Sequence, residues 1–345
     1  MSRAEPLVSA CIIARNEEAF VDECLQAVGA LAEELVLGNT GSTDRTVEIA
    51  QAHGARVIDV PWGEDFAAAR NAVLDKATGR WLLAVDCDEL LLADGVADAL
   101  EHLRSDALPP ALLVKILNRY PSGRTIEMLA PRLFARSAGF RYVHAIHEQL
   151  NADGAGAALT NLTLDHRGYL PEGACEAKER RNLAIARKMD DSPHANHCVA
   201  RSAMALKDWS LAIDYSRKLV NSDCGPLLML EGCAMGGGAA LANSDRASFE
   251  TFIALARTVC PDAPDIRLLE LLAAGQDYLH SLERYGMKEP GEYIRAPIFR
   301  HEPAGVEAWL TRRAIGHDGT DTHSDSRLSA SVDADKAQEE ARCLE

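Results

Sequence analysis

"WLLAVDCDELL", residues 81–91, is an apolar run that ends in three acids, Asp86, Asp88 and Glu89. A strand of this composition is expected to be buried, and an unpaired carboxylate is costly to bury. The acids are therefore expected at the end of the strand, where a ligand or a counter-charge can meet them. Because alternate side chains of an extended chain share one face, Asp86 and Asp88 can point at one ligand, whereas Glu89 faces the other way and is interpreted as structural.

Strand-like apolar runs alternate with amphipathic helical patterns upstream of this stretch. The predicted strands cover residues 7–14, 34–39, 55–61 and 80–86, and a helical pattern follows each of the first three. Strands that alternate with helices of about 10 to 15 residues indicate a parallel sheet covered on both faces. Asn16 is the predicted N-cap of the first helix, with Glu17 and Glu18 in its first turn, and Asp65 is the predicted cap of the third.

The pattern changes twice further along the chain. Strand-like pieces over 111–120, 125–135, 140–150 and 162–169 predict a mixed or antiparallel extension of the sheet, and amphipathic helices follow from about 176 to 285. The stretch "ALKDWSLAIDYSRKLV" (205–220) is similar to half of a tetratricopeptide repeat. The predicted domains are 1–172 (α/β, doubly wound, mostly parallel sheet), 173–312 (all-α helical hairpins) and 313–345, a polar tail predicted to be disordered.

Composition narrows the classes of function. The 345-residue chain has a formal net charge of −16, which argues against a nucleic-acid partner or an anionic membrane surface. Its nine cysteines are scattered with no C-x-x-C, which indicates free thiols in a reducing compartment rather than disulfides or a zinc site. The start of the chain is a poor signal peptide, and no run approaches the roughly 18 apolar residues of a membrane span. We expect a cytoplasmic protein without a membrane span.

Polar clusters follow three of the predicted strands. "ARNEE" ends the first strand, "NTGSTDRT" the second and "DCDE" the fourth. In a doubly wound sheet the ligand crevice lies beyond the carboxyl ends of the strands, so these clusters are expected to meet there. Two carboxylates with positions left for water and phosphate commonly hold Mg²⁺ or Mn²⁺ beside a nucleotide, whereas the simpler alternative is a strand end followed by a helix-capping Asp.

The cluster "NTGSTDRT" begins at Asn39 and Thr40. Its simplest interpretation is a tight turn that caps the next helix, and the same turn could place Asn39 or Thr40 against a base or ribose. The chain has neither G-x-G-x-x-G nor the Walker lysine at this turn, so a Rossmann dinucleotide site or a P-loop is not supported.

The ordered set "SACIIARNEE", "GNTGSTDRTVEIAQAHGARV", "PWGEDFAAARNAVLDKATGRWLLAVDCDE", "RLFA" and "IHEQL" resembles the family 2 glycosyltransferases of GT-A fold. The similarity covers residues 8 to about 220 and is strongest over 8–91. The chain most resembles the branch in which a tetratricopeptide-like helical region follows the catalytic domain. The resemblance implies an inverting, metal-dependent enzyme that moves a sugar from a nucleotide-diphosphate donor, often a UDP-sugar.

The resemblance also implies roles for particular residues. Asp86 and Asp88 match the D-x-D that binds metal, diphosphate and ribose, and Arg70 and Asn71 match the element that lines the donor site. The other implied or expected site residues are His147 and Glu148 near the acceptor, with Glu148 as general base; His166 as a metal or phosphate ligand; and Ala14, Asn16, Glu17, Asn39 and Thr40 at the donor-side strand ends. For Arg70, Glu148 and His166, structural roles remain alternatives.

Two positions depart from the family pattern. The family usually has Asp at the position of Asn39, where the carboxylate accepts a hydrogen bond from the base. The amide of Asn39 keeps an acceptor and adds a donor, so it suits uracil better than guanine. Cys87 replaces a commoner small residue and is expected to point to the opposite face as a buried thiol.

Two other functions remain open from the sequence. One is a nucleotidyltransferase, although "ARNEEAF" has no glycine for a phosphate loop, and the other is a decayed catalytic domain that serves as a binding scaffold. The sequence leaves the sugar and the acceptor unidentified. A peptide, a protein or a glycan would each fit the acceptor, and the helical region could also form a homo-oligomer.

Overall fold

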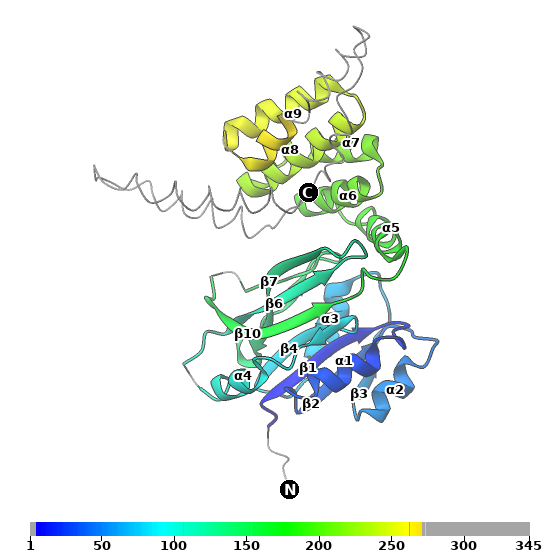
Figure 1. Cartoon of the computed structure of the whole chain (residues 1–345), viewed down its shortest axis with the longest axis vertical. Helices are drawn as coiled ribbons and strands as arrows, with labels where there is room; N and C mark the ends of the chain where they lie inside the picture. Colours follow the sequence, from blue (N-terminus) through cyan, green and yellow to red (C-terminus); the bar gives the residue numbers. More distant parts are fainter. Residues whose placement is uncertain (1–4, 106, 153, 262, 271–272, 274–345) are drawn as a thin grey trace, which may run out of the picture. The chain divides into compact units, whose positions relative to one another are not determined.

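The described residues form the predicted sheet with eight strands in the order β3-β2-β1-β4-β7-β6-β10-β5 (Figure 1). The structure is a computed structural model that describes residues 5–105, 107–152, 154–261, 263–270 and 273. The strands are β1 (Val8–Ala14), β2 (Glu34–Asn39), β3 (Arg56–Asp59), β4 (Trp81–Asp86), β5 (Glu89–Leu91), β6 (Ala111–Arg119), β7 (Thr125–Ala135) and β10 (Ala157–His166).

Strand direction brings several strand ends to one edge of the sheet. β1 is parallel to β2 and β4, with Ile13 paired to Asp86 and Ala14 to Asn39. β7 runs antiparallel to both β4 and β6, and β10 is parallel to β6. The carboxyl ends of β1, β2, β4, β6 and β10 therefore share one edge, and the predicted mixed extension of the sheet is confirmed.

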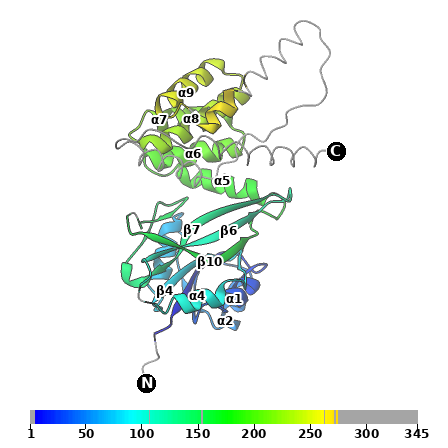
Figure 2. The same ribbon diagram turned by 60° about the vertical axis from the view of Figure 1, so that its left-hand side comes forward.

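Helices cover both faces of this sheet, as Figure 2 also shows. They are α1 (Val21–Val28), α2 (Thr46–Ala52), α3 (Phe66–Leu74) and α4 (Val96–His102). Buried residues of α1, α2 and α4 pack with Ala10 and Ile12 of β1, whereas α3 packs with Cys11 on the other face. The alternation of side chains along β1 thus produces the doubly wound arrangement. Residues 81–85 of β4 are all buried between these layers.

Some local predictions were confirmed and others were wrong. The Asp65 side chain accepts a hydrogen bond from Ala68 N at 2.8 Å, as its predicted capping role requires. Asn16 is not the N-cap of α1, because the helix begins only at Val21, after Phe20. Asn16 has φ of 57°, a left-handed conformation that ends β1 in a turn and delays the helix.

The stretch 140–150 was predicted as a strand but is mostly a loop. It forms only the short pair β8 (Tyr142–Val143) and β9 (Gln149–Leu150). His144 and His147 have φ of 73° and 50°, and such positive values break an extended chain. The loop is held by two backbone carbonyls, which accept hydrogen bonds from Phe66 N and from the ring of His194. The sequence interpretation also missed β5, α4 and the 3₁₀ turn η1 (Arg136–Ala138).

A helical region follows the sheet, as predicted. It comprises α5 (Ala174–Ala186), α6 (Pro193–Ala205), α7 (Trp209–Val220), α8 (Gly225–Ala242) and α9 (Arg246–Val259). Ser192, Asp208 and Asp245 cap α6, α7 and α9 with their side chains. These caps and the short connections produce successive helical hairpins. The rest of the predicted helical domain, from residue 274 to 312, and the predicted tail over 313–345 lie outside the described residues.

Helix α8 corrects the expectation about apolar runs. It has 18 residues and a mean hydropathy of 1.2, so among the described residues it alone is long and apolar enough to cross a membrane. However, 61% of it is buried inside the structure, and its glycines allow close packing. A Cβ on Gly236 would lie 2.4 Å from the Phe252 ring of α9. These features are typical of the central helix of a bundle.

The helical region packs directly on the loop that carries the predicted acceptor-side residues. Ile146 of the 144–148 loop is buried in one apolar cluster with Ile185 of α5 and with Cys198 and Val199 of α6. All described residues belong to one compact unit. The boundary predicted at residue 172 is therefore crossed by a buried apolar contact.

Candidate active site

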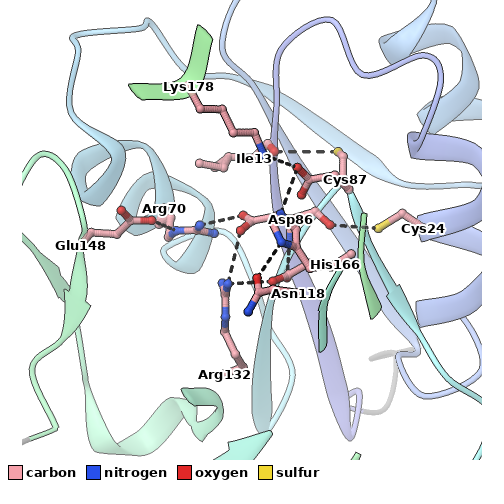
Figure 3. Close-up of polar contacts among 12 residues, drawn as sticks. Ile13, Cys24, Arg70, Asp86, Cys87, Asn118, Arg132, Glu148, His166 and Lys178 are labelled. Atoms are coloured by element: carbon pink, nitrogen blue, oxygen red, sulfur yellow. Dashed lines mark hydrogen bonds and ion pairs between the residues drawn. The ribbon is translucent and has the colours of Figure 1, made fainter. Parts of the chain in front are cut away.

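Asp86 lies at the end of β4 between two arginines (Figure 3). Arg70 Nη2 donates to Asp86 Oδ1 at 2.7 Å, and Arg132 Nη2 approaches Oδ2 at 3.3 Å. Burial alone would raise the pKa of Asp86, but these two guanidinium charges hold it well below its usual value. The carboxylate is therefore ionised, and each of its oxygens has an arginine partner.

Arg70 also connects the D-x-D to the predicted general base. Its Nε donates to Glu148 Oε1 at 2.7 Å, while its side chain is only 8% exposed. The arginine comes from α3, and Glu148 from the loop before β9. A single buried guanidinium thus sets the spacing between Asp86 and Glu148. Its third nitrogen, Nη1, is buried without a hydrogen-bond partner, so the structure places Arg70 between carboxylates and not on an open donor surface.

Asp88 meets a lysine and a histidine from later parts of the chain. Lys178 Nζ of α5 donates to Asp88 Oδ2 at 2.9 Å, and His166 Nε2 of β10 lies 3.4 Å from the same oxygen. Burial would raise the pKa of Asp88, but the hydrogen bond and charge of His166 and the charge of Lys178 lower it. Cys87, between the two aspartates, is buried with its Sγ near Ile13 O, as predicted for the opposite face.

The orientation of the His166 ring follows from its other nitrogen. Nδ1 lies 2.8 Å from Asn118 Oδ1, and Asn118 Nδ2 donates to Ile126 O at 3.4 Å. Because the amide nitrogen of Asn118 is used by that carbonyl, its oxygen faces the ring and His166 carries a proton on Nδ1. Nε2 is then directed at Asp88. A histidine oriented in this way by an outer partner is typical of metal-binding sites.

These residues fit a divalent cation that is coordinated partly by the protein and partly by a bound phosphate group and water. Asp88 and His166 direct ligand atoms at one point, although the described residues contain no group of three or more His, Cys, Asp or Glu side chains suited to a metal. Mg²⁺ and Mn²⁺ in nucleotide sites often take only one or two protein ligands, with phosphate and water in the remaining positions. Asp86 as a second ligand stays a prediction, since its ion pairs with Arg70 and Arg132 would have to loosen.

The ends of β1 and β2 bond to one another. Thr40 N and Oγ1 both donate to Ala14 O, at 2.9 and 3.1 Å. Asn16 Oδ1 accepts from Thr43 N at 2.7 Å, and Asn39 Oδ1 accepts from Ser42 N at 2.8 Å. The predicted donor-side residues therefore come together, as the parallel strands require. Within the described part of the chain, their side chains mainly hold this pair of turns.

Asn39 has an additional partner that sequence reasoning missed. Its Nδ2 donates to Asp59 Oδ1 at 3.1 Å, at the end of the neighbouring strand β3. The carboxylate that the family usually has at position 39 is thus present one strand away. Parallel register explains this position, since Asn39 pairs with Asp59 in the sheet.

Two further acids near the D-x-D have raised pKa values. Burial, and then the charge of Asp88, raise the pKa of Glu17 to about 7. Glu89 is 2% exposed and bonds Arg132 at 2.9 Å, and burial raises its pKa to about 7 against the charge of that arginine. Glu89 also accepts from Asp86 N at 2.9 Å. It therefore shapes the turn that presents the D-x-D.

Asn71 and His147 occupy supporting positions. Asn71 exchanges two hydrogen bonds with the backbone of Tyr142, each 2.9 Å long, so its amide anchors β8 to α3. The Nε2 atom of His147 is buried without a partner. Burial, and then the charges of Arg201 and other cationic groups, lower the pKa of His147 to about 3, so the ring is neutral near neutral pH.

Sequence reasoning missed three residues of the site, namely Arg132, Asn118 and Lys178. Arg132 lies within the "RLFA" element of the resemblance, which was a usable signal. Asn118 follows the apolar alternation of β6 and marks the end of a strand. Lys178 is one of several cations in "EAKERRNLAIARKM", and no local pattern separates it from its neighbours.

A cavity of about 250 Å³ lies away from these residues. It is lined by side chains between α3 and β7, including Leu74, Phe134 and Phe140. It contains none of the predicted site residues, so it gives no reason to move the site from the strand ends.

Part of the chain is similar to known proteins. Residues 9–149 match the model of the family described as Glycosyl transferase family 2. A TPR repeat-containing protein of Synechococcus elongatus is 36% identical over 143 residues, which cover 41% of this chain and 34% of that protein. The prophage-derived glycosyltransferase SunS of Bacillus subtilis is 25% identical over 233 residues, which cover 63% of this chain and 54% of SunS. The chain thus spans about a third of the first relative and about half of the second.

Among solved structures, residues 1–349 of TarS from S. aureus align with a TM-score of 0.44 and 13% identity, over 84% of this chain and 94% of that one. The family match covers both strand-end turns, the D-x-D and Glu148. Its residues form every strand of the mostly parallel sheet except β10, with helices on both faces. The part of the chain that forms most of this sheet therefore matches the family 2 glycosyltransferases, and a helical region follows it.

Proposed function

We propose that this chain is an inverting, divalent-metal-dependent glycosyltransferase that uses a UDP-sugar. The observation that carries the proposal is the D-x-D at the end of β4, in a family 2 domain, with a cationic group on each aspartate. An acid pair in this setting can hold a cation and a diphosphate together. The same end of the sheet carries Glu148, which can act on the acceptor.

Asp88 and His166 would hold the metal ion. The bound ion would neutralise the negative charge that develops on the leaving diphosphate. The chain's own contribution is to orient these ligands. Asn118 fixes the His166 ring through Nδ1, and Glu89 fixes the turn through Asp86 N.

Glu148 is the proposed general base. In the reaction an acceptor oxygen or other nucleophile bonds to the anomeric carbon of the sugar, and the bond from that carbon to the diphosphate breaks. The acceptor proton passes to the carboxylate, and UDP leaves with the bonding electrons. Glu148 uses Oε1 for Arg70, and no hydrogen bond is found to its Oε2 among the described residues. Arg70 is a positioning residue here, since it ties the base to Asp86.

The donor class follows from the ends of β2 and β3. Asn39 and Asp59 together present amide and carboxylate groups at the edge of the sheet. The amide of Asn39 suits the single N3–H of uracil, and the resemblance implies a UDP-sugar most often, so we favour UDP over GDP. We leave the acceptor open among peptide, protein and glycan. Location in the cytoplasm and homo-oligomer formation through the helical region also remain proposals.

Calorimetric titration of UDP and GDP, each with and without Mn²⁺, tests the donor and the metal. We expect UDP to bind in a metal-dependent manner and Asp88→Asn to remove that dependence. Binding of neither nucleotide at any Mn²⁺ concentration would remove the enzyme proposal.

Glu148→Gln tests the base. Loss of a positioned general base typically lowers the rate about 10²- to 10⁴-fold, so turnover should fall by that order while UDP binding is retained. Glu127→Gln is the matched control, because Glu127 lies in an exposed pair with Lys115. Equal turnover in the two variants would show that Glu148 is structural.

A further inference from the structure

Lys178 belongs to the helical region but reaches the D-x-D (Figure 3). It lies in α5, beyond the residues of the family match, and its Nζ donates to Asp88 Oδ2 at 2.9 Å. The lysine side chain is 28% exposed and the aspartate side chain 14%. The ammonium group is thus held at a mostly buried carboxylate while the lysine side chain remains partly exposed.

Neighbouring residues hold this contact closely. A Cβ added to Gly168 would lie 1.8 Å from Asp88 Oδ2 and 2.5 Å from Lys178 Nζ, so only glycine leaves room for the pair. The ammonium also lies 4.9 Å from the centre of the Tyr169 ring, a favourable cation–π distance. His166 Nε2 is directed at the same Asp88 oxygen. The lysine ammonium therefore bonds the same Asp88 oxygen that a cation held by Asp88 and His166 would use.

We propose that Lys178 is a tethered cation that holds Asp88 before a metal ion binds and turns to the donor diphosphate when a metal ion takes that carboxylate. The inference rests on the proposed function. A metal ion bound to Asp88 Oδ2 would repel an ammonium group 2.9 Å from the same oxygen, so metal binding favours release of the ammonium. The flexible four-carbon stem of lysine lets the displaced group move to a nearby phosphate.

This arrangement couples metal binding to donor binding. Without nucleotide, the metal ion competes with Lys178 for Asp88, and the Lys178–Asp88 ion pair is lost when the metal ion binds. With nucleotide present, the diphosphate offers the displaced ammonium a new partner, so each ligand favours the other. The helical region thereby supplies part of the donor site, although the family match ends before it.

The test is the substitution Lys178→Gln, followed by two titrations. If the ion pair is formed about 90% of the time, its loss makes Mn²⁺ bind about tenfold more tightly in the absence of nucleotide. UDP at saturating Mn²⁺ should bind about tenfold more weakly, because the variant loses a charge-assisted hydrogen bond to the diphosphate. The two affinities are expected to change in opposite directions, whereas general damage to the site would weaken both. Lys178→Arg keeps the positive charge, so its affinities for Mn²⁺ and for UDP should stay close to those of the wild type.

Lys188→Gln is the matched control, since Lys188 also pairs with a carboxylate of the catalytic domain, Glu64, at 2.6 Å, but at an exposed position. It should change neither affinity. Unchanged or weaker Mn²⁺ binding by Lys178→Gln, beside a wild-type chain that binds both Mn²⁺ and UDP, overturns the role of Lys178. A wild-type chain that binds no UDP contradicts the proposed function instead, and in that case a tighter Mn²⁺ site in Lys178→Gln still supports the displacement.

Discussion

The buried link Glu148–Arg70–Asp86 makes a strong prediction for Arg70→Leu. Arg70 is 8% exposed and bonds both carboxylates at 2.7 Å. Breaking a buried ion pair by removing one partner costs about 3 to 5 kcal/mol of unfolding free energy. Asp86 keeps Arg132 in this variant, whereas Glu148 loses its only ion-pair partner within the described residues. We therefore expect a loss near the lower figure, about 3 kcal/mol.

Urea unfolding followed by circular dichroism measures this loss. For a domain of this size, about 3 kcal/mol corresponds to a fall in melting temperature of roughly 6 to 12 °C. Arg141→Leu is the control, because Arg141 also pairs with an aspartate, Asp75, but the two side chains are 47% and 56% exposed. An exposed pair contributes about 0 to 1 kcal/mol. Equal losses in Arg70→Leu and Arg141→Leu would refute the reasoning, since burial is the main difference between the pairs.

Three further predictions concern the surroundings of the D-x-D. The pKa of His147 is lowered from 6.5 to about 3 in the folded chain. The stability that its neutral ring contributes is therefore fully present above pH 6.5 and is lost as the pH falls toward 3. His147→Gln should therefore lose less melting temperature between pH 7 and pH 5 than the wild type, and an equal loss would contradict this assignment. Asn118→Ala frees the His166 ring and should weaken Mn²⁺ binding in calorimetry about 10- to 100-fold, whereas unchanged affinity would show that the ring needs no outer partner. Gly168→Ala forces a Cβ to 1.8 Å from Asp88 Oδ2, so Mn²⁺ binding should fall by a similar factor, and wild-type affinity would mean that Asp88 can shift freely.

Local patterns predicted most of the elements. The interval 34–39 matches β2 and 125–135 matches β7, because apolar strands flanked by turn residues have a clear local signature. The same reasoning was wrong for 140–150, where the apolar alternation is present but His144 and His147 have positive φ. That conformation depends on hydrogen bonds from α3 and α6, which no local pattern contains.

The sequence by itself determined the D-x-D, its position at the end of a buried strand and the presence of polar turns after β1 and β2. Parallel strands then bring these clusters to one edge, so the sequence already predicted that Asp86, Asp88 and Asn39 lie at the same edge of the sheet. Glu148 was placed near the acceptor only through the family resemblance.

Only the tertiary structure decided what each acid contacts. Arg70, Arg132 and Lys178 are separated from their aspartate partners by 16, 46 and 90 positions. Their positions depend on the packing of α3, the register of β7 and the docking of α5. Charged side chains carry no periodic signal, and many surface cations of this chain resemble these three in sequence. Pairing of buried charges over such separations is a property of the packed fold, because only packing removes the water that would otherwise solvate each charge.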